Sequence, residues 1–174
     1  MKGLFAQERV TLRAIEPEDL PHFIRWENNS DLWSFGAQIQ PLSKFAISEY
    51  LEQTLTNDVF SMRQVRFVIE HEKTIVGCID FFDIDPLSRK ASIGLVIDND
   101  HQRNGFALEA MHKMLCYGFD MLNLHQIYAH VPVSNTPSIS LFEKSGFEKT
   151  ACLKDWICRK GKFEDVYLFQ HIRK

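Results

Sequence analysis

Two kinds of hydrophobic spacing occur along the chain, and each kind predicts a different element. Val10, Leu12 and Ala14 alternate with polar residues, which predicts a strand at residues 9–14. Apolar positions three and four residues apart predict helices at residues 17–28, 43–55, 107–122 and 137–145. Short apolar runs bounded by turn residues predict further strands at residues 66–70, 74–84, 93–97, 126–131, 148–159 and 163–171.

The order of these elements predicts one mixed sheet covered by helices. Short turns at residues 71–73, 85–88 and 160–162 join consecutive strands, which is typical of antiparallel pairing. The fold class is therefore α/β or α+β, and a length of 174 residues fits a single domain. The irregular apolar segment 32–42 is expected to be a surface loop that covers a substrate.

A polar loop connects the strand at residues 93–97 to the long helix. The first N–H groups of a helix have no intrahelical acceptor, and the helix dipole adds positive charge there, so this position favours phosphate. Gly105 permits a close turn, Ala107 is small, and Arg103 supplies a cation. The loop lacks the glycine patterns of Rossmann and P-loop proteins. A plain strand-to-helix connection is the alternative interpretation.

Two short motifs identify the family that the chain resembles. Gln102, Gly105 and Ala107 fit the pattern Q-x-x-G-x-A, and residues 135–147 fit the pattern N-x-x-[SA]-x-x-[LI]-[YF]-x-[KR]-x-G-F. Both are typical of the GNAT family of acetyl-CoA-dependent N-acetyltransferases. Over nearly its whole length the chain is similar to the bacterial spermidine/spermine N-acetyltransferases of that family, and less closely to the ribosomal-protein N-terminal acetyltransferases. A helix capped by Thr136 and ended by Gly146 would explain only part of the second motif.

The resemblance implies a GNAT fold, a mostly antiparallel mixed sheet with helices on both faces, and acetyl-CoA as the acetyl donor. Backbone groups of Leu95, Val96 and Ile97 would then pair with the pantetheine arm as an added strand would. Asn135 and Lys144 would touch the distal part of coenzyme A, and Phe142 would lie beside its sulfur. The pyrophosphate would be held by backbone amides of Gln102, Arg103, Asn104, Gly105, Phe106, Ala107 and Leu108.

Acetyl transfer to an amine requires a group that removes the ammonium proton and one that protonates the leaving thiolate. The resemblance points to Asp83, with Asp80 near it, to hold the ammonium or relay its proton, although a carboxylate at a strand end is often only a surface group. Phe142 stands where polyamine acetyltransferases usually carry a general-acid tyrosine, and it has no proton to give. Ser92 stands where the family often has glutamate, and residues 34–43 lack the carboxylates that bind polyamines in many relatives.

Composition narrows the range of partners. The net charge is −3 and the pI is about 6.2, so no basic field attracts nucleic acid or an anionic membrane. No apolar run approaches the roughly 20 residues that span a bilayer, and a secretory leader is not visible, so we expect a cytoplasmic protein. Cys78, Cys116, Cys152 and Cys158 lie in apolar segments and are expected to be reduced and mostly buried. The histidines lack metal-ligand spacing, and we expect no metal site.

Three functions fit the sequence. The leading hypothesis is transfer of an acetyl group from acetyl-CoA to a primary amine, with a polyamine such as spermidine as the acceptor. The second is the same chemistry on the N-terminus of a ribosomal or other protein, which an open acceptor groove would favour. The third is an acyl-CoA-binding sensor with little catalysis, for which Phe142 is the support. The sequence does not indicate an oligomeric state, although the polyamine relatives assemble into rings.

Overall fold

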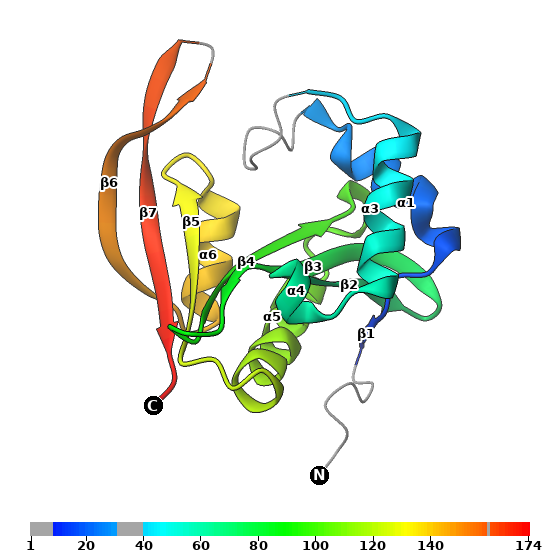
Figure 1. The fold of residues 1–174 in the computed structure, drawn as a ribbon. Helices are drawn as coiled ribbons and strands as arrows, with labels where there is room; N and C mark the ends of the chain where they lie inside the picture. The colour runs from blue at the N-terminus through cyan, green and yellow to red at the C-terminus, as the bar shows by residue number, and fades with distance from the viewer. Residues whose placement is uncertain (1–8, 31–39, 160) are drawn as a thin grey trace.

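The computed structural model describes residues 9–30, 40–159 and 161–174, and its centre is a seven-stranded sheet (Figure 1). The strands lie in the order β1-β2-β3-β4-β5-β7-β6, and β4 with β5 is the parallel pair among antiparallel neighbours. The predicted mixed, mostly antiparallel sheet is therefore confirmed. The strands are β1 (Thr11–Arg13), β2 (Val65–His71), β3 (Thr74–Asp85), β4 (Lys90–Ile97), β5 (Gln126–Pro132), β6 (Glu148–Arg159) and β7 (Lys162–Ile172).

The helices follow the predicted positions with some changes at their ends. The 17–28 segment begins with a 3-10 turn before α1, and the long helix ends in a π-helical turn at Tyr117–Met121. Gly118 in that turn packs directly on the sheet, because an added Cβ would lie 2.8 Å from the Phe81 ring. The helices are α1 (Leu20–Glu27), α3 (Lys44–Thr56), α4 (Val59–Met62), α5 (Phe106–Cys116) and α6 (Thr136–Lys144), and 3-10 turns lie at Pro17–Asp19 and Asn99–His101.

Two details of the sequence prediction were wrong. Asn135, not Thr136, caps α6, because its Oδ1 atom accepts a hydrogen bond from the Ser138 amide at 3.2 Å. The short helix α4 was missed, although Asp58 provides a cap of the usual type, with Oδ1 accepting from the amides of Phe60 and Ser61. The predicted covering loop at residues 32–42 lies largely outside the described residues.

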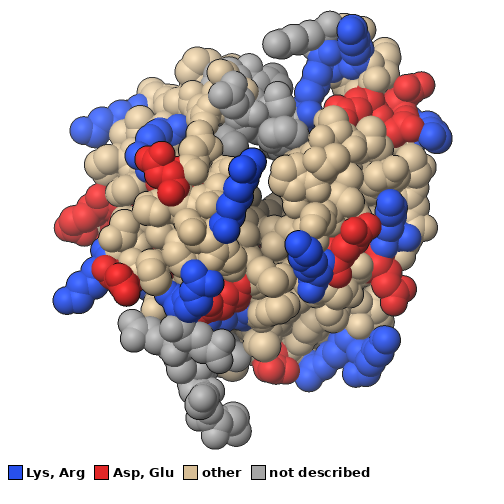
Figure 2. Space-filling model, turned by 180° about the vertical axis from the view of Figure 1, so that it is seen from behind, with Lys and Arg blue, Asp and Glu red and all other residues tan. Residues whose placement is uncertain are grey.

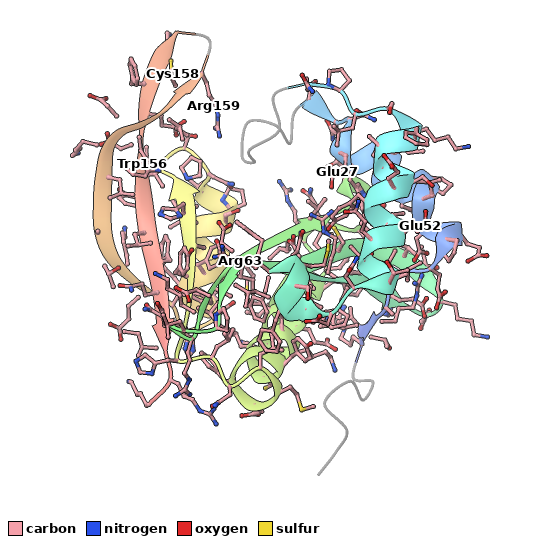
Figure 3. All side chains as sticks on the ribbon, viewed as in Figure 1. Glu27, Glu52, Arg63, Trp156, Cys158 and Arg159 are labelled. Atoms are coloured by element: carbon pink, nitrogen blue, oxygen red, sulfur yellow. The ribbon has the colours of Figure 1, made fainter. Side chains whose placement is uncertain are left out.

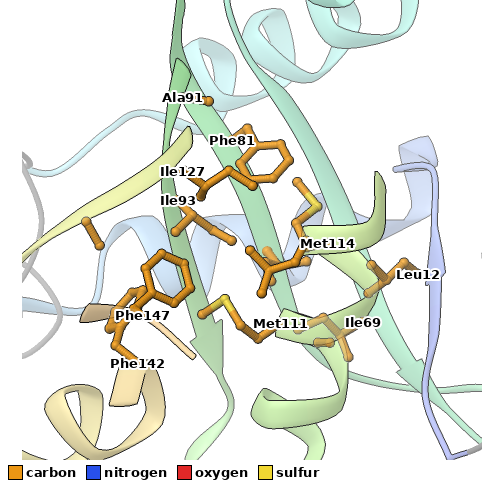
Figure 4. Packing of buried hydrophobic residues seen from close by; sticks show 14 of the residues in the cluster. Leu12, Ile69, Phe81, Ala91, Ile93, Met111, Met114, Ile127, Phe142 and Phe147 are labelled. Carbon is orange, nitrogen blue, oxygen red and sulfur yellow. The ribbon is translucent and has the colours of Figure 1, made fainter. Parts of the chain in front are cut away.

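Helices cover both faces of the sheet, as predicted. Val68 and Cys78 point toward α1 and α3, where they pack in one cluster with Phe23, Trp26 and Ile47. The opposite face carries the larger cluster, which Figure 4 shows around α5. Its members include Phe81, Ile93, Met111, Met114, Ile127, Phe142 and Phe147. Burial of each large apolar side chain contributes about 1.5–3 kcal/mol, so these two clusters hold the helices to the sheet.

Strands β4 and β5 pair over only a short distance and then separate. Their parallel register has three paired positions, Lys90 with Gln126, Ala91 with Ile127 and Ser92 with Tyr128. Beyond Ser92, β4 continues to Ile97 without a partner on its β5 side among the described residues. Unpaired N–H and C=O groups at such an edge can bond an added extended chain.

The cysteine prediction was wrong for most positions. Cys78 is buried between the sheet and the helices, whereas Cys116, Cys152 and Cys158 are exposed, and all four are free thiols. Cys152 and Cys158 lie on β6, where the hairpin with β7 leaves them open to solvent. Apolar neighbours in the sequence did not indicate burial there, because a hairpin at the sheet edge buries little of its surface.

We expect the fold to lose stability in acid through Asp19. This carboxylate accepts hydrogen bonds from Arg13 Nη1 at 2.7 Å, Arg13 Nη2 at 2.9 Å and the Glu16 amide at 2.8 Å. Burial by itself raises the pKa of Asp19, but the hydrogen bonds from Arg13 and Glu16 outweigh it and hold the pKa below its ordinary value. A lowered folded-state pKa stabilises the protein above the unfolded pKa of about 3.9, and this stabilisation is lost as the pH falls through the folded value.

Asp19→Asn should therefore cost about 2 kcal/mol of unfolding free energy at neutral pH. The difference between the two proteins should shrink as the pH falls below about 4, where the wild-type carboxylate is protonated as well. Urea unfolding at a series of pH values measures both. A difference that does not change with pH would contradict this assignment.

Candidate active site

The loop before α5 has a conformation set by its own side chains. Gln102 Nε2 donates to the Ile97 carbonyl at 3.2 Å and to Asn99 Oδ1 at 3.1 Å, so this side chain fixes the loop. Arg103 and Gly105 have φ angles of 63° and 81°, both in the left-handed region. Arg103, Asn104 and Gly105 are exposed. The motif residues thus form a tight, solvent-facing turn.

The N-terminus of α5 opens onto this turn. The first bond that closes the helix runs from the Glu109 amide to the Gly105 carbonyl at 3.3 Å, so the amides of Phe106, Ala107 and Leu108 precede the helical ladder. Phe106 is buried and its ring lies 4.6 Å from that of His71, which anchors the helix end. Glu109 Oε1 accepts hydrogen bonds from the backbone amides of Arg9 and Val10. Free amides at a helix N-terminus suit an anion, so the loop fits a pyrophosphate group.

The unpaired edge of β4 lies beside this helix end. The side chains of Leu95 and Ile97 pack toward α5, whereas that of Val96 packs toward α1 and α3. Because the side chains point to the two faces of the sheet, only backbone groups lie along the edge of the strand. On α6, Phe142 is buried and stacks on Phe169 with ring centroids 5.7 Å apart. Lys144 is exposed at the end of the same helix. Leu95, Ile97, Phe106 and Phe142 thus belong to one hydrophobic cluster that β4, α5 and α6 share.

Asp80 belongs to a network of buried ion pairs. Its Oδ2 atom accepts hydrogen bonds from Gln64 Nε2 at 2.9 Å and from Arg66 Nη2 at 3.1 Å. Arg66 Nη1 donates to Glu27 Oε1 on α1 at 2.8 Å. The side chains of Arg66 and Asp80 are only 16% and 11% exposed, whereas that of Glu27 is 29% exposed, so the Arg66–Asp80 pair is the most buried part of the network. Its two carboxylates and one guanidinium carry a net negative charge on the face that α1 and α3 cover.

Tyr50 on α3 adjoins this network. Its ring centroid lies 5.4 Å from the Arg66 guanidinium, and burial raises the pKa of Tyr50 to about 12. Its hydroxyl is buried and has no hydrogen-bond partner within the described ranges. The phenol therefore stays protonated at physiological pH.

Asp83 lies in a different environment from Asp80. The register between β3 and β4 shifts after Phe82, and Asp83 in this bulge has a φ angle of 51° and is exposed. Asp83 lies close enough to β5 for its negative charge to affect the pKa of Tyr128 and of His130. The two candidate carboxylates thus differ, since one is bound in an ion pair and the other is open to solvent.

Sequence reasoning missed an aromatic group on β5 and β6. Ile127, Ala129 and Val131 are buried toward α5 and α6, so Tyr128 and His130 point to the opposite face of β5. The His130 ring stands at 86° to the Tyr128 ring and is nearly parallel to Trp156, with an angle of 11° and centroids 6.3 Å apart. The alternation of buried and exposed positions along β5 could have indicated Tyr128 and His130, but no sequence pattern near them indicates the contact with Trp156.

Tyr128, His130 and Trp156 flank the part of the sheet that no described helix covers. Figure 1 shows α1 and α3 on one side of it and the β6–β7 hairpin on the other. In Figure 3, Trp156 and Arg159 lie on the hairpin side, Glu27 lies on the helix side, and Arg63 lies between them. The separating strands β4 and β5 form the floor. Ser92, at the position where the family often has glutamate, is buried in that floor opposite Tyr128.

Other features of the surface give little sign of a further ligand. The face in Figure 2 carries acidic and basic side chains interspersed, with no continuous region of one sign. In residues 9–30, 40–159 and 161–174, no group of three or more metal-ligating side chains could hold a metal ion. Within the same ranges, none of the helices is long and apolar enough to cross a membrane.

Comparison with known proteins identifies the family. Residues 9–148 match the family model described as an acetyltransferase (GNAT) domain. A spermidine N(1)-acetyltransferase of Vibrio cholerae is 31% identical over 159 residues, which cover 91% of this chain and 90% of that protein. A crystal structure of spermidine N-acetyltransferase from V. cholerae in complex with CoA and spermine matches with a TM-score of 0.85 and 29% identity, over 95% of this chain and 96% of that one. A putative ribosomal N-acetyltransferase of Bacillus subtilis is 22% identical over 171 residues, or 96% of this chain and 93% of that protein.

The fold and the site thus define an acyltransferase, and the chain belongs to the GNAT acetyltransferase family. The predicted fold, enzyme class and acetyl donor, acetyl-CoA, are confirmed by this membership. When bound, acetyl-CoA supplies the activated thioester. The chain itself presents a tight turn at Gly105, the amides that precede the α5 ladder and an unpaired edge of β4.

The ion-pair network predicts a large loss of stability for Arg66→Met. The variant leaves the carboxylates of Asp80 and Glu27 without their shared cation, and breaking a buried pair in this way costs about 3–5 kcal/mol. The matched control is Asp120→Asn, which breaks the exposed pair with Arg173 and should cost less than about 1 kcal/mol. Urea unfolding compares the two. Equal, small effects would mean that the network does not hold α1 to the sheet.

Proposed function

We propose that this acetyltransferase transfers an acetyl group to a primary amine of a polyamine such as spermidine. The observation that carries the proposal is the likeness, over nearly the whole of both chains, to the V. cholerae enzyme in complex with CoA and spermine. The chemistry of the uncovered face supports it. Asp83 offers a carboxylate to a cationic amine, and the faces of Tyr128, His130 and Trp156 suit an alkyl ammonium chain.

The predicted coenzyme residues remain our assignment of that site. Backbone amides from Gln102 to Leu108 would hold the pyrophosphate, and the β4 edge at Leu95, Val96 and Ile97 would pair with the pantetheine arm. Asn135, which also caps α6, and Lys144 would contact the distal part of coenzyme A. A backbone N–H of the strand that carries Leu95 would polarise the thioester carbonyl, as the donors of an oxyanion hole do.

The candidate catalytic carboxylates receive different roles. Asp83 is exposed in its bulge and would hold an ammonium group of the acceptor. Asp80 is already paired with Arg66, so it would contribute a fixed negative charge rather than a proton relay. Phe142 would pack beside the coenzyme sulfur and donates no proton.

Several wider predictions accompany this function. We propose that residues 1–174 form one domain, because all described strands share one sheet. A dodecameric structure of the V. cholerae relative supports a homo-oligomer here as well. The cytoplasmic location stays a prediction.

The acceptor is tested by coenzyme A release from acetyl-CoA with separate amines. We expect saturable turnover with spermidine and spermine, and a higher KM for n-butylamine, which has one charge and therefore loses a contact with the carboxylates. Turnover only with an N-terminal ribosomal peptide would replace the polyamine by a protein N-terminus. Tight binding of acetyl-CoA without turnover of any acceptor would indicate the sensor function.

The coenzyme assignment is tested by Gly105→Ala. A Cβ at a φ angle of 81° strains the turn by about 1–2 kcal/mol and moves the amides that face the pyrophosphate, so the KM for acetyl-CoA should rise about tenfold. The matched control is Gly161→Ala in the β6–β7 turn, where φ is 74° and an added Cβ meets nothing within 4 Å. That variant should bind acetyl-CoA normally. A normal KM in Gly105→Ala would remove the loop from the coenzyme site.

A further inference from the structure

We propose that His130 accepts the proton that the acceptor ammonium must lose before it can attack, an inference that rests on the proposed function. The ammonium N–H bond breaks, the proton passes to an imidazole nitrogen, and its electron pair stays on the amine as the nucleophile. The imidazolium then releases the proton to solvent.

The register of the sheet places His130 where the acceptor must arrive. Tyr128 is the last β5 residue that pairs with β4, opposite Ser92, so His130 stands two residues further, across from Gly94 where the strands have separated. Gly94 pairs with Asp80 on its other side. Because Gly94 has no side chain, the floor between His130 and Asp80 stays open. A Cβ at Gly94 would lie 3.3 Å from Asp80 Oδ1 and 3.3 Å from the Phe82 ring.

The aromatic rings of Tyr128 and Trp156 hold the His130 imidazole beside this open part of the sheet. Tyr128 meets it edge to face at a centroid distance of 5.7 Å, and the Trp156 indole lies nearly parallel to it. Trp156 comes from a bulge in β6 that Asp165 holds, since Asp165 Oδ1 accepts the Asp155 amide at 3.0 Å. His130 is nevertheless exposed, so its proton can leave to water.

The surrounding charges leave His130 able to act as a base. Partial burial lowers the pKa of His130 below its ordinary value while Asp83 opposes this shift, so the ring is neutral at physiological pH and its protonated form faces a carboxylate. Arg63 and Asp85 act on the neighbouring Tyr128. On the hairpin, Lys154 pairs with Asp165 at the bulge that carries Trp156, and Arg159 pairs with Glu164.

The other candidate bases are less suitable. Asp80 Oδ2 already accepts hydrogen bonds from Gln64 and Arg66, so this oxygen is not free to face an acceptor ammonium. Asp83 is exposed, and the proposed function already uses its carboxylate to hold an ammonium group of the acceptor. An imidazole has the intermediate pKa that proton transfer near neutral pH requires.

His130→Gln separates this role from simple packing when kcat/KM for spermidine is measured from about pH 6 to about pH 10. Near neutral pH the variant should be slower by about 10²-fold, and the deficit should close toward pH 10, because an amine of pKa about 10 then needs no base. The control His125→Gln changes an exposed histidine just before β5 and should match the wild type at every pH.

Each outcome decides the proposal. A deficit that is the same at all pH values, or no deficit, overturns the role of His130 while the wild-type rate still reports on the proposed function. If the wild type acetylates only an N-terminal peptide, the same comparison with that acceptor should show the deficit closing near pH 8, the approximate pKa of an α-amino group. A wild-type protein inert with both acceptors overturns the proposed function and this role together.

Discussion

The separation of β4 from β5 is the constraint on which the site depends. Backbone pairing between these parallel strands stops at Ser92 and Tyr128. Gly118 holds the closed end, because its contact with Phe81 on β3 and Ile127 on β5 allows no side chain there. Beyond that point the strands separate, and the edge of β4 that faces β5 is unpaired. On the face opposite α5, no described helix covers this part of the sheet. In the proposed function, the donor and the acceptor would approach this opening from opposite faces of the sheet.

The parts of the site that the sequence predicted are those that local motifs encode. The turn at Gly105 and the start of α5 lie within a few residues of one another, so the resemblance to the GNAT motif Q-x-x-G-x-A was enough to select them as the candidate pyrophosphate site. The α6 motif was found in the same way, although the structure shows that Asn135 is also the helix cap. Local chemistry of this kind survives in a single sequence because the chain needs no long-range contact to place it.

The remaining groups depend on strand register, which a single sequence does not supply. Arg66 and Asp80 form an ion pair because β2 and β3 align them directly, and Glu27 joins them from α1. His130 meets Trp156 only because β7 lies between β5 and β6 and a bulge brings the indole over. Asp80 lies in the regular register of β3 and is buried beside Arg66, whereas the exposed Asp83 lies in the bulge after Phe82. Their positions along one strand did not distinguish them.

The phenylalanine at position 142 changes where proton chemistry can occur. Phe142 is buried against Phe147 and Phe169, where it helps to hold α6 to β7, and its own ring has no hydroxyl. Tyr128, His130 and Asp83 are titratable groups that flank the part of the sheet no described helix covers. Burial and the charge of Asp83 raise the pKa of Tyr128, so its hydroxyl keeps its proton, while His130 is left neutral. The protonated Tyr128 phenol and the neutral His130 imidazole thus lie next to each other on β5. Under the proposed role of His130, β5 would therefore supply the proton acceptor in a chain that lacks the usual hydroxyl on α6.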